Sequence, residues 1–190
     1  TGSPEMRGKA HAAMARLYDA TDQLEPAERE YRNAAKIGRE NDLTVMEAVA
    51  SVNLGGLLQE AGRGDEAREC LLRAVSLLEG ENNLRVLSVA LGNLGWVQHN
   101  MGEMPEAERN LLRGADAARR TGSRVDLAVI LGNLANVYMD QKRTELGLDT
   151  YRQALELHLE IGTRRHEGIV RGDYGWGLGQ CGRHEEAQRE

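Results

Sequence analysis

One stretch governs the architecture of this chain: Leu91-Gly92-Asn93-Leu94-Gly95-Trp96-Val97-Gln98-His99-Asn100-Met101-Gly102-Glu103-Met104-Pro105-Glu106-Ala107. Versions of its beginning recur at a step of 40 residues. Going forward, the chain reads Leu131-Gly132-Asn133-Leu134-Ala135 and then Gly172-Asp173-Tyr174-Gly175-Trp176. Going back, it reads Val52-Asn53-Leu54-Gly55-Gly56. The chain is therefore built from copies of one unit.

The end of the stretch recurs at the same step. Its counterparts are Glu25-Pro26-Ala27, Glu66-Ala67, Leu146-Gly147 and Glu186-Ala187. A period of this size is the signature of a solenoid, in which each unit packs only on its neighbours. We therefore expect an elongated body.

Every unit shows helical spacing of apolar residues, and no segment alternates with the period of a strand. The sequence predicts one all-α repeat domain over 1–190, with nine full helices and a truncated tenth. Because the last unit is unfinished, we expect the chain to be a fragment of a longer array. The helices are expected near 5–21, 24–40, 43–61, 65–79, 84–101, 105–120, 124–141, 144–161 and 164–181, in units of about 5–41, 42–82, 83–122, 123–162 and 163–190.

Turn and contact residues refine this prediction. Glycines such as Gly62, Gly80 and Gly102 follow the helical patterns and predict helix ends, and Thr144 is expected to cap the start of a helix. A Gly inside a helix costs about 1 kcal/mol relative to Ala. The glycines within the first helices should therefore allow close approach of the paired helix, which carries a small residue in register. These are Gly55, Gly95 and Gly175, opposite Ala67, Ala107 and Ala187.

The repeat resembles the tetratricopeptide repeat, and the resemblance covers essentially the whole chain. The resemblance implies a right-handed α-α superhelix of about five helix-turn-helix repeats, the last one truncated. The common unit has about 34 residues, so this longer unit is similar to the long-helix subclass named for Leu-Gly-Asn, here Leu91-Gly92-Asn93 and Leu131-Gly132-Asn133. Gln98 departs from the pattern and is expected to weaken one core contact. The matching residues are Leu54-Gly55 with Leu58, Leu94-Gly95 with Gln98, Leu134-Ala135 with Tyr138, Tyr174-Gly175 with Leu178, and, in second helices, Ala67/Leu71/Ala74, Ala107/Leu111/Gly114 and Gly147/Tyr151/Ala154.

A polar face lies opposite the leucine arc of each first helix, at about 100° per residue. The resemblance implies that first helices line the concave groove, so this inner strip is the candidate peptide-binding surface. Asn side chains can bracket a bound backbone, and Trp supplies a large anchor. The binding residues are expected to be Asn53, Asn93, Trp96, Asn100, Asn133, Asn136, Asp140, Asp173 and Trp176, with Gly56, Glu60 and Gln180 completing the strip.

Two alternatives remain open for these residues. The repeated Asn53, Asn93 and Asn133 could hydrogen-bond between neighbouring first helices and set the superhelical pitch. Trp96 and Trp176 could be packing residues in a chain without Phe.

Other chemistry is not indicated. The net charge of −6, with acidic and basic residues interspersed, argues against nucleic-acid binding. No apolar run approaches the ~20 residues of a membrane span. The five His and two Cys show no metal-ligand or disulfide spacing, and no catalytic constellation or cofactor motif is present. We expect no metal, no cofactor, no membrane partner and a cytoplasmic, reducing environment.

The sequence favours a protein-interaction scaffold that binds a peptide or protein segment in its concave groove and is not an enzyme. The alternative is a sensory or regulatory arm of a larger signalling ATPase, kinase or transcription regulator. It would bind a small effector or control oligomerisation. The sequence gives no indication of the oligomeric state or of the partner's identity.

Overall fold

The computed structural model describes residues 2–188, which form ten α-helices and contain no β-strand. The predicted helices are all present, and the nine long ones have ends within two residues of the prediction. The helices are α1 (Pro4–Asp19), α2 (Leu24–Glu40), α3 (Thr44–Glu60), α4 (Gly64–Glu79), α5 (Leu84–Asn100), α6 (Met104–Thr121), α7 (Arg124–Asp140), α8 (Thr144–Ile161), α9 (Arg164–Gln180) and α10 (His184–Ala187).

Most helices end in a left-handed residue, as the glycine positions predict. Gly62 and Gly102 have φ of +74° and +79°, a conformation that costs glycine little. Lys142 adopts φ of +62° at the equivalent place in the fourth unit. Gly80 ends α4 with φ of −84°, so this turn does not use the left-handed conformation. The prediction for Thr144 was wrong: it is the first helical residue of α8, and the preceding residue makes no side-chain cap.

The small residues bring the paired helices together. A Cβ on Gly55 would lie 2.6 Å from Leu71 Cγ, and one on Gly95 would lie 2.5 Å from Leu111 Cγ. Ala107, on the second helix of its pair, is fully buried, and a Cβ on Gly95 would lie 3.1 Å from its carbonyl oxygen. The predicted close approach is therefore confirmed for the α3–α4 and α5–α6 pairs.

The residue of the first helix and the residue of the second helix that meet at this contact vary together between units. Leu71 and Leu111, whose side chains branch at Cγ, face glycine, whereas the equivalent Tyr31 and Tyr151 occur in units that carry Ala15 and Ala135. All four of these second-helix side chains are buried. We attribute the pairing to shape, because a flat ring leaves space beside its Cγ that a branched leucine fills.

Gln98 has a buried partner. It is 5% exposed, and its Oε1 accepts a hydrogen bond of 2.7 Å from Nδ2 of Asn110 on α6. A buried amide that is hydrogen-bonded avoids the desolvation cost of an unpaired one. The departure from the apolar pattern therefore replaces a core contact with a polar link between α5 and α6.

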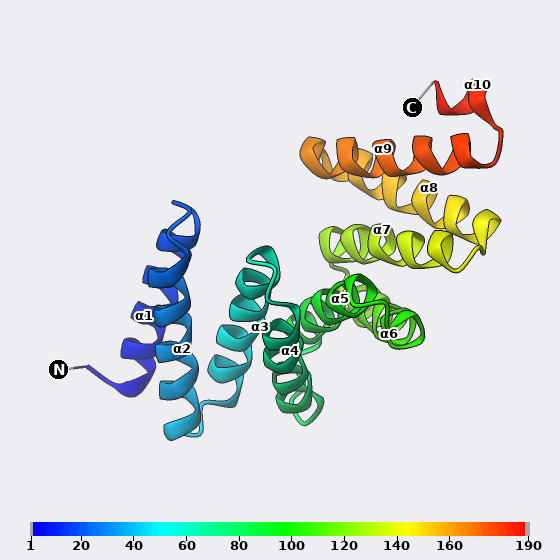
Figure 1. The fold of residues 1–190 in the computed structure, drawn as a ribbon. Helices are drawn as coiled ribbons and strands as arrows, with labels where there is room; N and C mark the ends of the chain where they lie inside the picture. Colours follow the sequence, from blue (N-terminus) through cyan, green and yellow to red (C-terminus); the bar gives the residue numbers. More distant parts are fainter. Residues whose placement is uncertain (1, 189–190) are drawn as a thin grey trace.

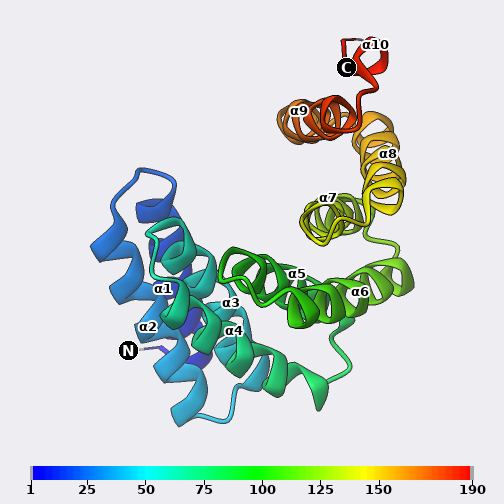
Figure 2. The same ribbon diagram turned by 45° about the vertical axis from the view of Figure 1, so that its right-hand side comes forward.

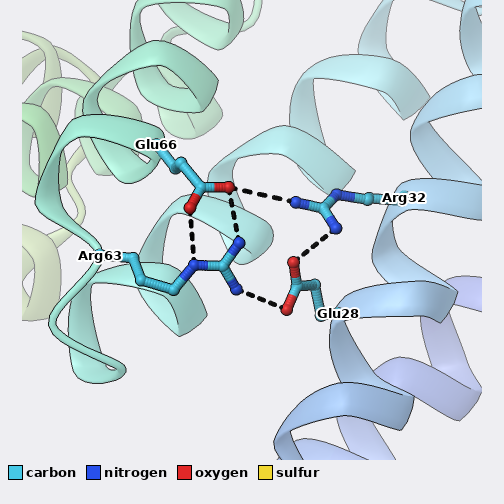
Figure 3. A network of polar contacts seen from close by, with 4 residues as sticks. All are labelled: Glu28, Arg32, Arg63 and Glu66. Carbon is cyan, nitrogen blue, oxygen red and sulfur yellow. Dashed lines mark hydrogen bonds and ion pairs between the residues drawn. The ribbon is translucent and has the colours of Figure 1, made fainter.

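Neighbouring units are also joined by ion pairs between residues 35 positions apart. Figure 3 shows one junction, in which Arg63 contacts both Glu28 of α2 (2.7 Å) and Glu66 of α4 (2.6 Å), while Arg32 completes the ring. The same junction recurs one and two units later, and its polarity is reversed in the first of these cases. These pairs are Glu103 with Arg68 and Arg143 with Glu108.

The helix pairs follow one another in chain order, with the two termini at opposite ends of a curved body (Figures 1 and 2). First helices contact one another directly, α1 with α3, α3 with α5, α5 with α7 and α7 with α9. Among the described residues, second helices meet one another through side-chain ion pairs such as Arg32 with Glu66, and their backbones do not approach as closely. Elements on the inside of a curve lie closer together than those outside. The chain is therefore the expected α-solenoid, and its first helices form the inner surface.

Candidate functional site

Three asparagines repeat along this inner surface at one-unit intervals. Asn53, Asn93 and Asn133 are partly exposed on α3, α5 and α7. Within residues 2–188, none of their side-chain amides has a hydrogen-bond partner. The pitch-setting alternative, which requires bonds between neighbouring first helices, therefore finds no support in these three residues. Their donors and acceptors remain open to solvent.

Five of the nine predicted residues meet in one hollow of about 290 Å³ between α5, α7 and α9. They are Trp96, Asn136, Asp140, Asp173 and Trp176. The rest of the lining consists of His99, Met139 and Tyr151. Trp96 is partly buried and Trp176 is 63% exposed, so Trp176 is not a core packing residue.

Hydrogen bonds hold the polar groups of this hollow in place. The hydroxyl of Tyr151 on α8 donates to Oδ1 of Asn136, which lines the hollow together with Asp173 of α9. Burial raises the pKa of Asp173, and the polar amide of Asn136 offsets only part of this effect. Burial likewise holds the pKa of Tyr151 well above its ordinary value. Asn136 thus has a structural role that links α7 to its neighbours.

Asp140 supplies the second carboxylate of this hollow, and its partner is His99. Nε2 of His99 lies 2.7 Å from Oδ2 of Asp140 on the next first helix. The ring of His99 also stands 5.4 Å from that of Trp96, centre to centre. Nδ1 of His99 is buried and has no partner within the described residues. His99 therefore contacts both Asp140 and Trp96.

A second hollow, of about 190 Å³, lies between α1, α3 and α5. Asn53 and Asn93 line it together with Glu60 and Asp19. Its floor is Tyr31, whose hydroxyl is 3.5 Å from Asp19 and whose pKa is raised to about 12 by burial and by that carboxylate. The two hollows thus share one plan, in which a tyrosine from a second helix reaches the inner surface beside acidic and amide groups.

The remaining predicted residues are dispersed. Asn100 is exposed at the end of α5, beside a separate hollow that includes Gln59 and Met101. Asn133 lies on α7 outside the hollows described above. The inner strip is therefore a row of distinct places, and the binding roles of its residues stay predictions.

Sequence reasoning missed a larger hollow, of about 690 Å³ between α1 and α3. Its lining is mainly apolar and includes Ala12, Val45, Met46 and Val49. It also missed Tyr151 and His99 as parts of the smaller hollow. A signal for Tyr151 was present, because Tyr occupies that repeat position in units that carry Ala in the first helix.

The described part of the chain contains neither a metal-binding cluster nor a membrane-spanning helix. Residues 2–188 contain no group of three His, Cys, Asp or Glu side chains that could hold a metal ion. Among the same residues, no helix combines the length and apolar composition needed to cross a bilayer. Cys70 and Cys181 are both free thiols.

Comparison with known proteins gives a consistent fold. The model of a family described as tetratricopeptide repeat matches residues 46–120 and 126–189. No curated protein sequence matches the chain significantly. At the sequence identities of the solved structures, similarity shows the fold alone.

Three of these structures span nearly all of this chain. The apo form of RapI superposes with a TM-score of 0.87 at 16% identity, covering 98% of this chain and 69% of that one. The TPR-like repeats of the Podosopora anserina putative kinesin light chain give a TM-score of 0.78 at 15% identity, covering 100% and 93%. BtubC (BKLC) from P. vanneervenii gives 0.77 at 14% identity, covering 100% and 88%.

Proposed function

Because the chain belongs to the tetratricopeptide repeat family, we propose that it is a protein-interaction scaffold whose inner strip binds an extended segment of another polypeptide. The observation that carries this proposal is the row of amides at Asn53, Asn93 and Asn133, which have no hydrogen-bond partner among residues 2–188. Each residue of an extended segment offers one backbone donor and one acceptor. An Asn amide can satisfy both.

The spacing of these amides suits an extended chain. Helices in contact have axes about 10 Å apart, and an extended chain advances about 3.3 Å per residue. Amides on successive first helices would therefore meet about every third residue of the segment. Each bond would contribute about 0.5–1.5 kcal/mol.

Several finer assignments follow from the same reading. The 40-residue step and helices of 16–18 residues favour the long-helix Leu-Gly-Asn subclass. The two free thiols favour a reducing cytoplasmic setting. The inner strip binds its ligand and does not catalyse a reaction. In the sensory-arm alternative, a small effector would replace the polypeptide.

Selection of displayed random peptides against the chain, followed by calorimetric titration of the selected peptides, tests the proposal. The double variant Asn93→Ala/Asn133→Ala should keep its melting temperature and weaken peptide binding several-fold. Gln153→Ala is the matched control, because it removes an exposed amide from α8 on the outer layer. Unchanged affinity in a folded double variant would contradict the proposal. Saturable binding of a small metabolite, with no peptide selected, would favour the sensory arm.

A further inference from the structure

We propose that the hollow between α5, α7 and α9 is a pocket for an arginine side chain of the bound segment. This inference rests on the proposed function, because the segment lying along the inner strip would present that side chain. It adds the chemical class of the ligand, which the fold does not specify.

The first observation is the aromatic lining. Trp96 and Trp176 come from α5 and α9 and line the same hollow, with α7 between these two helices. Trp176 is 63% exposed, so its ring is accessible to a ligand. Tyr151 and His99 complete the aromatic part of the lining. Aromatic faces attract cations, and indole does so most strongly.

The second observation is negative charge without a lysine or arginine partner. Asp140 and Asp173 line the hollow, and no Lys or Arg lines it. Within residues 2–188, Asp140 pairs only with His99, and Asp173 forms no ion pair. Three carboxylates at repeat junctions, Glu28, Glu103 and Glu108, do have an arginine partner. A cation entering the hollow would supply the missing countercharge to Asp173, which is also partly desolvated.

The third observation is that these carboxylates are already held in place. The hydrogen bond from Tyr151 orients Asn136 in the same hollow as Asp173, and His99 pairs with Asp140. Groups fixed before binding lose little conformational entropy when the ligand arrives. The hollow therefore has the character of a formed recognition site.

The charge of the whole inner strip agrees with this inference. Its twelve members in the second to fifth units include Glu60, Asp140 and Asp173 and contain no Lys or Arg. Such a strip repels acidic segments and attracts basic ones. Arginine fits better than lysine, because its planar guanidinium stacks on aromatic faces and forms forked bonds to carboxylates.

The occupant is a polypeptide because two amides of the strip stand one helical turn from members of the hollow, Asn93 from Trp96 and Asn133 from Asn136. Asn93 and Asn133 lie on the same two helices, α5 and α7, that supply Trp96 and Asp140. A backbone running past these amides could place one side chain in the hollow. A free amino acid would leave the amides unused.

The two tryptophans provide a direct test, because they are the only ones in the chain and both line the hollow. The probes are short Gly/Ser peptides with one central residue, which is arginine, citrulline, lysine or glutamate. Their titration is followed by NMR on the two indole N–H signals. We expect both signals to shift saturably with the arginine peptide, in the millimolar range or tighter. The citrulline peptide, of nearly the same shape but uncharged, should bind at least about fivefold more weakly.

Replacing the aspartates of the hollow by asparagine tests the same charge interaction from the side of the protein. Asp140→Asn and Asp173→Asn should each weaken binding of the arginine peptide several-fold, whereas Asp116→Asn, on the exposed surface of α6, should leave it unchanged. Equal binding of the arginine and citrulline peptides, or no saturable shift of either indole signal, would overturn the inference. The citrulline comparison uses the unmodified chain, so misfolding of a variant cannot obscure it.

Two further outcomes separate this inference from the proposed function. If the selected peptides bind at the strip but neither contain arginine nor move the indole signals, the pocket is wrong and the scaffold function stands. If N-acetylarginine amide binds as tightly as the arginine peptide, the flanking backbone contributes nothing. The polypeptide occupant is then wrong.

Discussion

Replacing Gly55 by alanine tests the packing that joins each helix pair. The added Cβ would lie 2.6 Å from Cγ of Leu71 and within 3.2 Å of both its Cδ atoms. Ordinary contacts of a Cβ begin near 3.4 Å. Leu71 is fully buried, so α3 and α4 must separate or the leucine must leave its rotamer. Overpacking of this kind costs about 1–3 kcal/mol.

The same substitution also has a favourable part, because alanine stabilises a helix by about 0.5–1 kcal/mol relative to glycine. Gly132→Ala isolates that part. Its Cβ would meet Val170 at 3.5 Å, an ordinary contact. We expect Gly132→Ala to raise the melting temperature and Gly55→Ala to lower it. The two should differ by about 1–3 kcal/mol.

A compensating substitution makes the test sharper. Gly55→Ala combined with Leu71→Tyr recreates the Ala–Tyr pairing of the first and fourth units. The double variant should be more stable than Gly55→Ala alone, with a coupling of about 0.5–3 kcal/mol. Circular dichroism melts and urea titrations at 222 nm measure the unmodified chain, Gly55→Ala, Gly132→Ala, Leu71→Tyr and the double variant. Equal stabilisation by both single substitutions would refute the close-approach argument, and additivity in the double variant would refute the shape argument.

Two further predictions concern pH. Burial of Glu47 alone would raise its pKa, but Arg73 and Arg39 together hold the pKa below its ordinary 4.5. The ionised carboxylate therefore stabilises the fold at neutral pH, and this stabilisation is lost as the pH falls below 4.5. Glu47→Gln should therefore cost about 1–3 kcal/mol at neutral pH and flatten the acid limb of a melting-temperature profile; an unchanged limb would contradict this. Burial and the neighbouring His166 lower the pKa of His158 from 6.5, so the stability it contributes is complete above that pH and declines below it. His158→Leu should reduce the fall in melting temperature between about pH 7.5 and 5.5, and an equal fall in both proteins would count against the argument.

The fold could be predicted because its signals are local and repeated. The 40-residue registration placed nine long helices to within two residues, and glycines such as Gly62 marked their ends. Lys142 has no such mark and adopts a left-handed conformation because the turn geometry repeats around it. Propensity alone gives no reason to expect that conformation in lysine.

The site was predicted less completely, because its geometry depends on contacts between units. Repetition places Trp96 and Trp176 at equivalent positions, but only the curvature brings residues 80 positions apart to one hollow. His99 reaches Asp140 across 41 positions for the same reason. The sequence also does not reveal that Gln98 has Asn110 as its partner, since no repeat of either residue suggests the pair.

Site-specific photo-crosslinking tests the central claim, that the inner strip holds the ligand, most directly. A photoreactive residue replaces Asn93 on the inner surface in one protein and Arg109, which is 64% exposed on α6, in the other. Each is irradiated with a selected peptide and analysed by mass spectrometry. We predict a covalent adduct from position 93 and none from position 109. An adduct from position 109 alone would show that the ligand binds the outer layer.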